Sequence, residues 1–547
     1  MAKHNGRLGK TYRIMWDQNA GLECFYNPPM DPAKVAQAHF GHFEGTPVDA
    51  YVCALGCNAG YIVGWPTKVK GMEFFVDRLT AGKLVGGAHW WRAAENLRLL
   101  WEDGIDPVQV QIDEAARLGV DFWFRLSMND WHHYEDDTGR SINLMGSSFF
   151  DDHPSYRIGP DLGPGMGETL RHLQDYAHPE VRRLRLETAV EACERYDVTG
   201  FEYDFMRCPL YFKHSEVNQH IPLMTEFVRQ TRAALDAVGE KKGHPIGLSV
   251  RVPNTIAGAL NLGLDVPVWI KEDLVDIVVP STFFNADLEE DISEWVTLAE
   301  GTPVRINPAI EEAYSAGHTG GVNRCFYSPP VMLPLSREMV NAIAARHWRN
   351  GADGLYVFNW FGTSATYGAA YGYDINVALD DIGNPLRLKH KNKRYVVMRT
   401  DGSFPNCLPH PRQLPATIGE EELNIHLDVA DDLAAAGSRL RSVLLSVNFK
   451  DFTVYDRVEI KLSGKVLTCI NPRVPGAYDP STSTWQNYNL RESLPRVGDN
   501  VITFRITGRN QRLKNELSIV ITDIELEVEY DYPNGPWVEP PGYQPRT

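Results

Sequence analysis

Apolar residues over the first 360 positions recur in two alternating patterns. Short runs rich in Val, Ile, Tyr and Phe are typical of buried strands, and longer segments with helical spacing lie between them. Eight strands are predicted, over 11–17, 48–55, 120–126, 199–205, 245–251, 275–281, 303–307 and 353–359. Helices are predicted near 31–43, 107–118, 178–197, 220–238, 266–273, 288–299 and 336–350. Because strand–helix alternation builds a parallel sheet, eight repeats predict an α/β fold, a (β/α)8 TIM barrel.

The pattern changes after residue 380. A polar stretch at 387–394 is typical of a linker, and from about residue 395 strand-type runs are separated by turns rich in Gly, Pro and Asn. We therefore expect a (β/α)8 barrel domain over 1–390 and a C-terminal antiparallel β-sandwich accessory domain over 391–547. The sequence leaves open whether the second domain binds a ligand or braces the barrel.

The joints between the predicted elements are unequal in length. Helix-to-strand joints are short, whereas two strand-to-helix joints, 56–105 and 127–177, are long and rich in Trp, His and Gly. Long loops in a compact domain are usually functional or disordered, and these carry little solvating charge. Barrel active sites are built from strand-to-helix loops, so we expect a deep site at the carboxyl ends of the strands.

Two carboxylates interrupt the apolar strand over 199–205. Alternation places its aromatic residues on one face and Glu202 and Asp204 on the other, about 6–7 Å apart along the strand. The aromatic face suits the helix layer, so the acidic face is predicted to point into the barrel. Carboxylate pairs at about 5–5.5 Å or about 6.5–9.5 Å are the catalytic groups of glycoside hydrolases. We interpret Asp204 as nucleophile or general base and Glu202 as general acid or its modulator, the alternative being that either one only orients an arginine.

A third acid, Glu311, follows the strand over 303–307. Catalytic residues of barrels come from the ends of several strands, which makes Glu311 the alternative acid partner of Asp204. A solvated loop glutamate is the other interpretation of this residue. The sequence does not decide whether Asp204 pairs with Glu202 or with Glu311.

Polar residues on other strands are candidates for substrate binding. Arg125, Arg251 and Arg305 cannot easily lie under an apolar helix layer and are predicted in the lumen. They would either compensate the buried carboxylates or grip an anionic sugar, a uronate or a sulfate ester. The candidate substrate-binding residues are Asp17, Arg125, Asn129, Asp130, Trp131, His132, Arg207, Arg251, Asn307 and Trp360, with Trp65, Trp90 and Trp91 as further candidates for a cleft wall.

Composition and motifs narrow the class of partner. The formal net charge of -17 disfavours nucleic acid. The sequence carries no P-loop, dinucleotide-binding or zinc-protease motif and no Cys-x-x-Cys pair, and the adjacent His132 and His133 point in different directions. We therefore expect neither a cofactor nor a metal, and a carbohydrate as the only partner.

The expected compartment follows from the apolar runs. None approaches the roughly 20 residues that cross a bilayer, and the first residues lack the apolar core of a secretory signal. We expect a cytoplasmic protein, or a periplasmic or secreted one if a leader was removed.

Several stretches resemble a known family. They are "MNDWHH", "YAHPEVRRLRLETAVEACERYDVTGFEYDFMRCPLYF", "IGLSVRVPNT" and "GLDVPVWIKEDLVDIVVP". Together they resemble bacterial glycoside hydrolase-like TIM-barrel proteins related to the family-10-like hydrolases, through most of the barrel and more weakly beyond it. Thr199 stands where the family pattern has an aspartate, whereas the matching positions are Gly200, Glu202, Asp204 and Arg207. The resemblance implies a barrel acting on carbohydrate and gives no substrate.

The sequence thus predicts a glycoside hydrolase that cleaves a poly- or oligosaccharide by paired-carboxylate acid/base chemistry. Two alternatives stay open: a non-catalytic glycan-binding protein on the same scaffold, and a carbohydrate lyase or isomerase that uses the acids for proton transfer. Sugar, linkage, stereochemical outcome and oligomeric state are not predicted.

Overall fold

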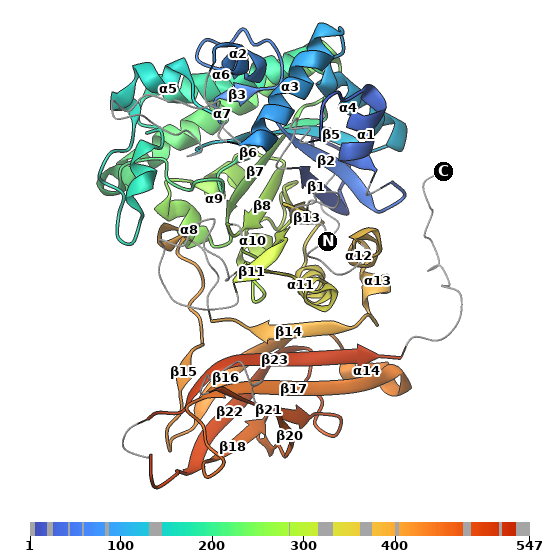
Figure 1. Cartoon of the computed structure of the whole chain (residues 1–547), viewed down its shortest axis with the longest axis vertical. Coiled ribbons are helices and arrows are strands. Elements are labelled where there is room, and N and C mark those ends of the chain that lie inside the picture. The colour runs from blue at the N-terminus through green and yellow to red at the C-terminus, as the bar shows by residue number, and fades with distance from the viewer. Residues whose placement is uncertain are drawn as a thin grey trace.

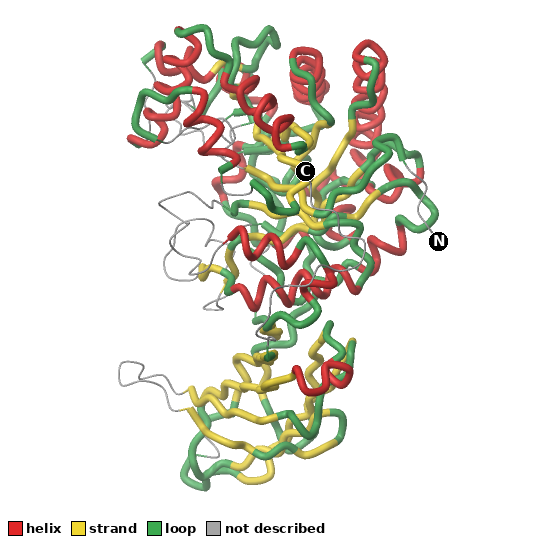
Figure 2. Tube along the Cα trace, turned by 90° about the vertical axis from the view of Figure 1, so that its right-hand side faces the viewer, coloured by secondary structure: helices red, strands yellow, loops and turns green. Residues whose placement is uncertain are grey.

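The computed structural model consists of an α/β domain and an antiparallel β domain, which lie end to end in Figures 1 and 2. It describes residues 6–18, 26–41, 44–56, 60–82, 87–130, 145–283, 285–315, 332–360, 375–399, 404–473, 483–513 and 517–531. Within these ranges, no helix is long and apolar enough to cross a lipid bilayer.

A parallel sheet forms the centre of the α/β domain, in the order β10-β13-β1-β2-β5-β6-β7-β8-β9. Its strands are β1 (Ile14–Gln18), β2 (Val48–Ala54), β5 (Asp121–Ser127), β6 (Gly200–Asp204), β7 (Gly247–Pro253), β8 (Ile277–Ser281), β9 (Arg305–Ile306), β10 (Ala309–Glu311) and β13 (Leu355–Phe358). All eight predicted strands contribute to it. The predicted parallel α/β architecture is therefore confirmed as a TIM-like domain.

The two end strands of this order, β9 and β10, are consecutive in the chain. The Asn307 backbone N–H donates to the Val278 carbonyl of β8 at 3.0 Å, and the Tyr356 N–H of β13 donates to the Pro308 carbonyl at 2.9 Å. One short segment therefore bonds to both edges of the sheet.

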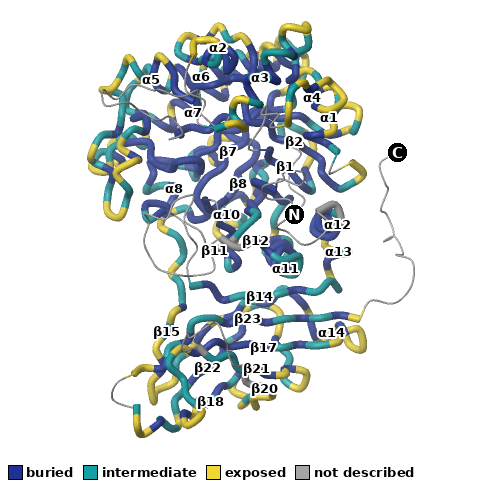
Figure 3. The backbone as a smooth tube through the Cα atoms, in the orientation of Figure 1, coloured by how far each residue is buried: buried dark blue, intermediate teal, exposed yellow. Residues whose placement is uncertain are grey.

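Helices cover the outer face of the sheet, and Figure 3 shows the strands buried beneath them. They are α1 (Pro32–Phe40), α2 (Phe75–Thr80), α3 (Ala88–Glu102), α4 (Pro107–Leu118), α5 (Ser148–Asp152), α6 (Pro179–Arg195), α7 (Val217–Lys242), α8 (Ile256–Asn261), α9 (Val266–Lys271), α10 (Ser293–Leu298), α11 (Arg337–Arg349), α12 (Ile375–Ile382) and α13 (Pro385–Leu388). The predicted loop over 56–105 is a partial error, since it contains α2 and α3; Ala93, Leu97 and Leu100 give α3 a buried stripe at helical spacing.

The side of the sheet away from the helices encloses an interior that Trp123 fills near the amino ends of the strands. The Trp123 ring packs against Tyr12 with ring centroids 5.9 Å apart. Gly200 and Gly247 leave room for it, because a Cβ atom on either would lie 2.3 or 2.5 Å from the indole. Side chains nearer the carboxyl ends of the strands then occupy the rest of the interior.

The second domain contains two antiparallel sheets. One has the order β14-β23-β17-β21-β20, with β15 beside β23, and the other β16-β22-β18-β19. The strands are β14 (Lys393–Val397), β15 (Ala416–Thr417), β16 (Leu423–Val429), β17 (Leu440–Lys450), β18 (Arg457–Leu462), β19 (Lys465–Val466), β20 (Cys469–Arg473), β21 (Ser483–Asn489), β22 (Gly498–Gly508) and β23 (Val520–Tyr530). Leu445 of β17 and Ile502 of β22 belong to one hydrophobic cluster, so the two sheets share a core.

The two domains are joined by more than the linker. Arg346 and Arg349 of α11 both bond Asp428 of β16, at 2.9 and 2.7 Å. After β14 the chain returns to the α/β domain, where the Asn406 Nδ2 bonds the Pro209 carbonyl at 2.5 Å and the Thr255 hydroxyl bonds the Leu408 carbonyl at 3.0 Å. Residues beyond the predicted boundary therefore pack on the loops that follow β6 and β7.

The packing of Trp123 makes Gly200 a sensitive position. We expect Gly200→Ala to lower the free energy of unfolding by about 1–3 kcal/mol, because the added methyl overpacks the interior. The matched control is Gly508→Ala on β22, where the new Cβ atom would meet Arg457 at an ordinary 3.5 Å. Urea unfolding of both variants measures the difference, and equal effects would contradict the packing argument.

Candidate active site

Six charged side chains meet inside the sheet toward the carboxyl ends of its strands. The charge cluster consists of Asp17, Arg125, Glu202, Asp204, Arg251 and Glu311, from β1, β5, β6, β7 and β10. Each is at most 1% exposed. Because an unpaired buried charge is costly, the pairing within the cluster decides which groups are available for chemistry.

Asp204 is bound on both carboxylate oxygens. Its Oδ2 accepts from an Arg125 nitrogen at 2.7 Å. Its Oδ1 accepts from an Arg251 nitrogen at 3.1 Å and from the Met206 backbone N–H at 2.8 Å. Two arginines from the neighbouring strands therefore compensate the charge of this one carboxylate.

Arg251 links Asp204 to Glu311. One terminal nitrogen contacts Asp204, and the other contacts Glu311 Oε1. The guanidinium lies 3.6 Å from the centroid of the Phe358 ring, and its Nε donates to the Ser281 hydroxyl at 3.0 Å. Glu311 Oε2 is buried and has no hydrogen-bond partner among the described residues.

Glu202 has a different set of partners. Its Oε2 accepts from the Ser249 hydroxyl at 2.7 Å, and its Oε1 lies 2.7 Å from the Tyr356 hydroxyl oxygen. The same hydroxyl lies 2.8 Å from Asp17 Oδ2, which is also 2.7 Å from Arg125 Nε. Glu202 therefore has both oxygens occupied, whereas Asp17 Oδ1 has no hydrogen-bond partner in the described part of the chain.

Burial raises the pKa values of three of these carboxyl groups. It raises the pKa of Asp17 to about 6, although Arg125 acts in the opposite direction. Burial, reinforced by the charge of Asp17, raises the pKa of Glu202 to about 7. Burial raises the pKa of Glu311 to about 8 despite the favourable charge of Arg251. Glu311 is therefore mostly protonated at neutral pH, as a general acid must be.

Three further predicted residues hold the loops near the carboxyl ends of the strands. Asn129 Nδ2 donates to the Gln174 and Leu210 carbonyls at 3.1 and 2.6 Å, so it ties three loops together. Asp130 and Arg207 form a buried ion pair at 3.4 Å. None of these three contacts the charge cluster in a described hydrogen bond or ion pair.

Asn307 is buried between β9 and β10, and its side-chain atoms have no hydrogen-bond partner in the described ranges. Trp131 and His132 lie outside the described residues.

The structure separates several other predicted residues from the interior. Trp360 is buried in the main hydrophobic cluster, where its Nε1 donates to the Ile310 carbonyl at 3.0 Å. Trp65 is buried in the same cluster and bonds Glu191 at 3.2 Å. Arg305 pairs with Asp353 at 3.6 Å near the amino end of β13. Burial of the indoles among apolar side chains explains why they do not line the charge cluster.

Tyr356 and Phe358 were not among the site residues predicted from the sequence. Both point into the interior, where they contact charge-cluster residues. Alternation along 353–359 does place them on one face, but a Tyr and a Phe on a buried strand carry no sign that this face meets charges.

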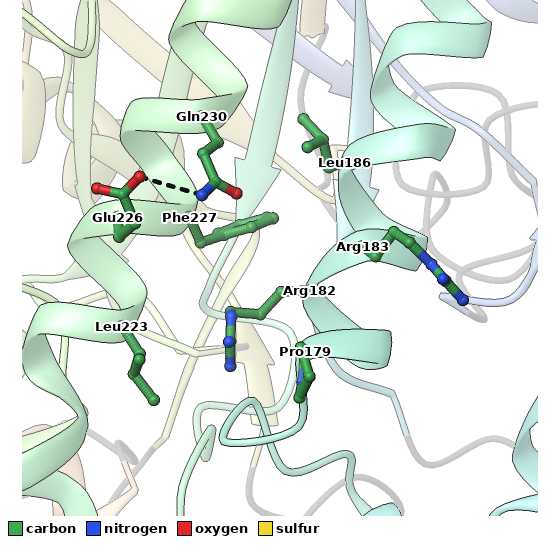
Figure 4. Close-up of a pocket in the computed structure, with 8 residues that line it drawn as sticks. All are labelled: Pro179, Arg182, Arg183, Leu186, Leu223, Glu226, Phe227 and Gln230. Carbon is green, nitrogen blue, oxygen red and sulfur yellow. Dashed lines mark hydrogen bonds between the residues drawn. The ribbon is translucent and has the colours of Figure 1, made fainter.

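A surface pocket lies elsewhere, in the groove between α6 and α7 (Figure 4). It has a volume of about 240 Å³ and is lined by Pro179, Arg182, Arg183, Leu186, Leu223, Glu226, Phe227 and Gln230. No charge-cluster residue borders it. Within the described ranges, no three histidine, cysteine or acidic side chains are grouped so as to hold a metal ion.

No protein-family model matches the sequence, and no curated protein matches it. The resemblance to the family-10-like proteins therefore stays a prediction.

Among the solved structures that the chain matches are a fucosidase, a chitinase and an N-acetylglucosaminidase. An alpha-L-fucosidase isoenzyme 2 from Paenibacillus thiaminolyticus is 13% identical at a TM-score of 0.35, over 69% of this chain and 49% of its own. A family GH18 chitinase from Chromobacterium violaceum is 10% identical at a TM-score of 0.32, over 91% of this chain and 89% of its own. A glycoside hydrolase family 18 N-acetylglucosaminidase from Paenibacillus barengoltzii is 10% identical at a TM-score of 0.35, over 68% of this chain and 99% of its own. The chain thus spans about half of the fucosidase. TM-scores this low assign no activity.

Arg251 is expected to be essential for stability. Arg251→Gln leaves the Asp204 carboxylate buried without one of its two cations and the Glu311 carboxyl group without its hydrogen-bond donor, so the free energy of unfolding should fall by about 3–5 kcal/mol. Arg229→Gln is the matched control, because Arg229 is 43% exposed and pairs with Glu226 and Glu272 in solvent. Denaturant unfolding should show a large loss only for Arg251→Gln, and equal losses would contradict the role of the cluster.

The raised pKa values also predict how stability depends on pH. Unfolded glutamates lose their protons near pH 4.3, whereas Glu202 and Glu311 keep theirs to about 7 and 8 in the folded chain. Stability from these groups is therefore complete below pH ~4.3. It falls by about 1.4 kcal/mol per pH unit for each proton as pH rises above this value, and it is lost once pH has passed about 7 for Glu202 and about 8 for Glu311. Glu311→Gln removes this titrating group, so the free energy of unfolding of the variant should fall less steeply than that of the parent between pH 5 and pH 8. An unchanged slope would contradict the assignment.

Proposed function

We propose that the protein is a glycoside hydrolase in which Glu311 is the general acid and Asp204 is the nucleophile or general base. The observation that carries the proposal is the state of Glu311: a buried carboxyl group with a pKa of about 8, one oxygen without a hydrogen-bond partner among the described residues, and a guanidinium shared with Asp204. A glycosidase needs one protonated and one ionised carboxyl group at the scissile bond.

The roles follow from the contacts. Glu311 Oε2 would give its proton to the glycosidic oxygen as the bond to the anomeric carbon breaks. Asp204 would stabilise or attack the positive centre that forms, or activate the water that does so. Glu202 lies on the same face of β6 as Asp204 and contacts Ser249 and Tyr356, so it acts as a modulator of Asp204 in this scheme.

The substrate class proposed is a poly- or oligosaccharide. Arg125 and Arg251 already contact carboxylates, which favours charge compensation over a subsite for an anionic sugar. A uronate or sulfated sugar is therefore not required by this site, and both neutral and anionic glycans belong in the test.

We also propose an architecture for the whole chain. The segment of β9 and β10 completes a (β/α)8 barrel, and the two antiparallel sheets form a sandwich that braces it. The contacts of Arg346 and Arg349 with Asp428 and of Asn406 with Pro209 support a bracing role.

A second candidate function is glycan binding without catalysis. It is favoured by the burial of the charge cluster, whose members are at most 1% exposed and paired with one another. In that case the cluster only fixes the fold. Direct measurements of turnover and binding separate the two functions.

The test is a screen of the purified chain on neutral and anionic polysaccharides. Glu311→Gln and Asp204→Asn should each lower kcat by about 10²–10⁴-fold, because each removes a group that acts in the bond-breaking step. Glu191→Gln makes the same chemical change on α6, where the carboxylate bonds Trp65 and Thr67 outside the interior, and should leave kcat unchanged. Circular dichroism checks folding.

Each outcome points to one function. Near-normal turnover in folded Glu311→Gln or Asp204→Asn contradicts the catalytic role proposed for that acid. Glycan binding without hydrolysis by the parent favours the second candidate, and an unsaturated product that absorbs in the ultraviolet indicates a lyase.

A further inference from the structure

Tyr356 lies between two carboxyl groups, and its hydroxyl contacts both. The hydroxyl oxygen is 2.8 Å from Asp17 Oδ2 and 2.7 Å from Glu202 Oε1. Both distances are typical of good O–H···O hydrogen bonds. The Tyr356 side chain is fully buried, so both contacts are made in the interior of the sheet.

A phenol has one proton and donates one hydrogen bond. The second short contact therefore requires a proton on a carboxyl group, because two oxygen atoms without a proton between them repel each other at this distance. Burial and the neighbouring carboxylates raise the pKa of Tyr356 well above its ordinary value, so the phenol keeps its own proton. The Asp17 and Glu202 pair must hold one additional proton.

The surrounding charges indicate which carboxyl group holds it. Asp17 Oδ2 is 2.7 Å from Arg125 Nε, which favours the ionised form of Asp17. Glu202 contacts the Ser249 hydroxyl and Tyr356, and among the described residues no arginine lies within ion-pair distance of it.

We propose that Glu202 is a carboxylic acid that donates to Tyr356, and that Tyr356 in turn donates to Asp17. The other Glu202 oxygen accepts from Ser249, so every contact has one donor and one acceptor. In this state Arg125 and Arg251 balance the charges of Asp17 and Asp204. Tyr356 is therefore a positioning residue that keeps Glu202 neutral beside Asp204.

This arrangement has a consequence for catalysis that rests on the proposed function. With Glu202 neutral, Asp204 meets no like charge from the residue two positions before it on β6. Glu311 is then the acid that is free to protonate a substrate. The proton on Glu202 itself is independent of any activity, so it can be tested without a substrate.

Infrared spectra of the whole chain between pH 5 and pH 9 test the proposal. A protonated carboxyl group has a C=O band that disappears on ionisation, and part of this band at pH 5 should be missing in Glu202→Gln. Tyr356→Phe should shift both the frequency of the Glu202 band and the pH at which it disappears, because the acid loses its acceptor. Tyr395→Phe is the matched control: its buried hydroxyl bonds the single carboxylate of Asp431 at 2.8 Å, so its loss should leave the Glu202 band unchanged.

Two results overturn the proposal. Equal carboxylic acid bands in the parent and Glu202→Gln would mean that Glu202 is ionised. If Tyr356→Phe leaves the frequency and the titration of the Glu202 band unchanged, Tyr356 is not the hydrogen-bond acceptor that keeps Glu202 protonated. If Tyr356→Phe fails to fold, a fluorotyrosine at position 356 keeps the size and raises the acidity of the hydroxyl, and must still shift the band. A positive infrared result in a chain without hydrolytic activity supports the proton assignment and overturns only the catalytic scheme.

Discussion

The ion pairs between Asp204 and two arginines connect strands that are far apart in the sequence. Arg125 joins β1 to β6 through Asp17 and Asp204, and Arg251 joins β6 to β10 through Asp204 and Glu311. Since a slip of one residue would turn every one of these side chains toward the helices, the ion pairs and the strand register depend on each other. Removing one partner from such a buried pair is strongly destabilising, because it leaves the other charge uncompensated.

The need to pair buried charges also explains the two regions of the interior, one filled by aromatic rings near the amino ends of the strands and one filled by charged side chains nearer the carboxyl ends. Trp123 near the amino ends excludes water from one side, and the charges nearer the carboxyl ends must therefore satisfy one another. Desolvation then raises the pKa values of Glu202 and Glu311, and within the described part of the chain Glu311, unlike Glu202, has one oxygen without a hydrogen-bond partner. The features that stabilise the fold and those that would support catalysis are thus the same contacts.

Much of the fold could be predicted from the sequence. The strands over 199–205 and 245–251 have apolar residues that only a sheet covered by helices explains, and alternation gave the common face of Glu202 and Asp204. Arginine compensation of these acids and the pairing of Asp204 with Glu311 were among the predicted alternatives, but the choice between them and the contacts of Tyr356 depend on how β1, β6, β10 and β13 are arranged in space, which alternation along one strand does not give. Trp65 and Trp360 were predicted to line a cleft, but both lie in the main hydrophobic cluster. The sequence could not separate the two positions, because a tryptophan is large and apolar enough for either.

The indole of Trp123 also determines how the interior can be reached. It occupies the space between Gly200 and Gly247 with Tyr12 beside it, so the amino-terminal end of the interior is sealed by packed rings. A molecule bound beside Glu311 would therefore have to enter and leave from the side of the carboxyl ends of the strands. A glycan chain could present an end or a bend to this site, but it could not be threaded along the axis of the sheet.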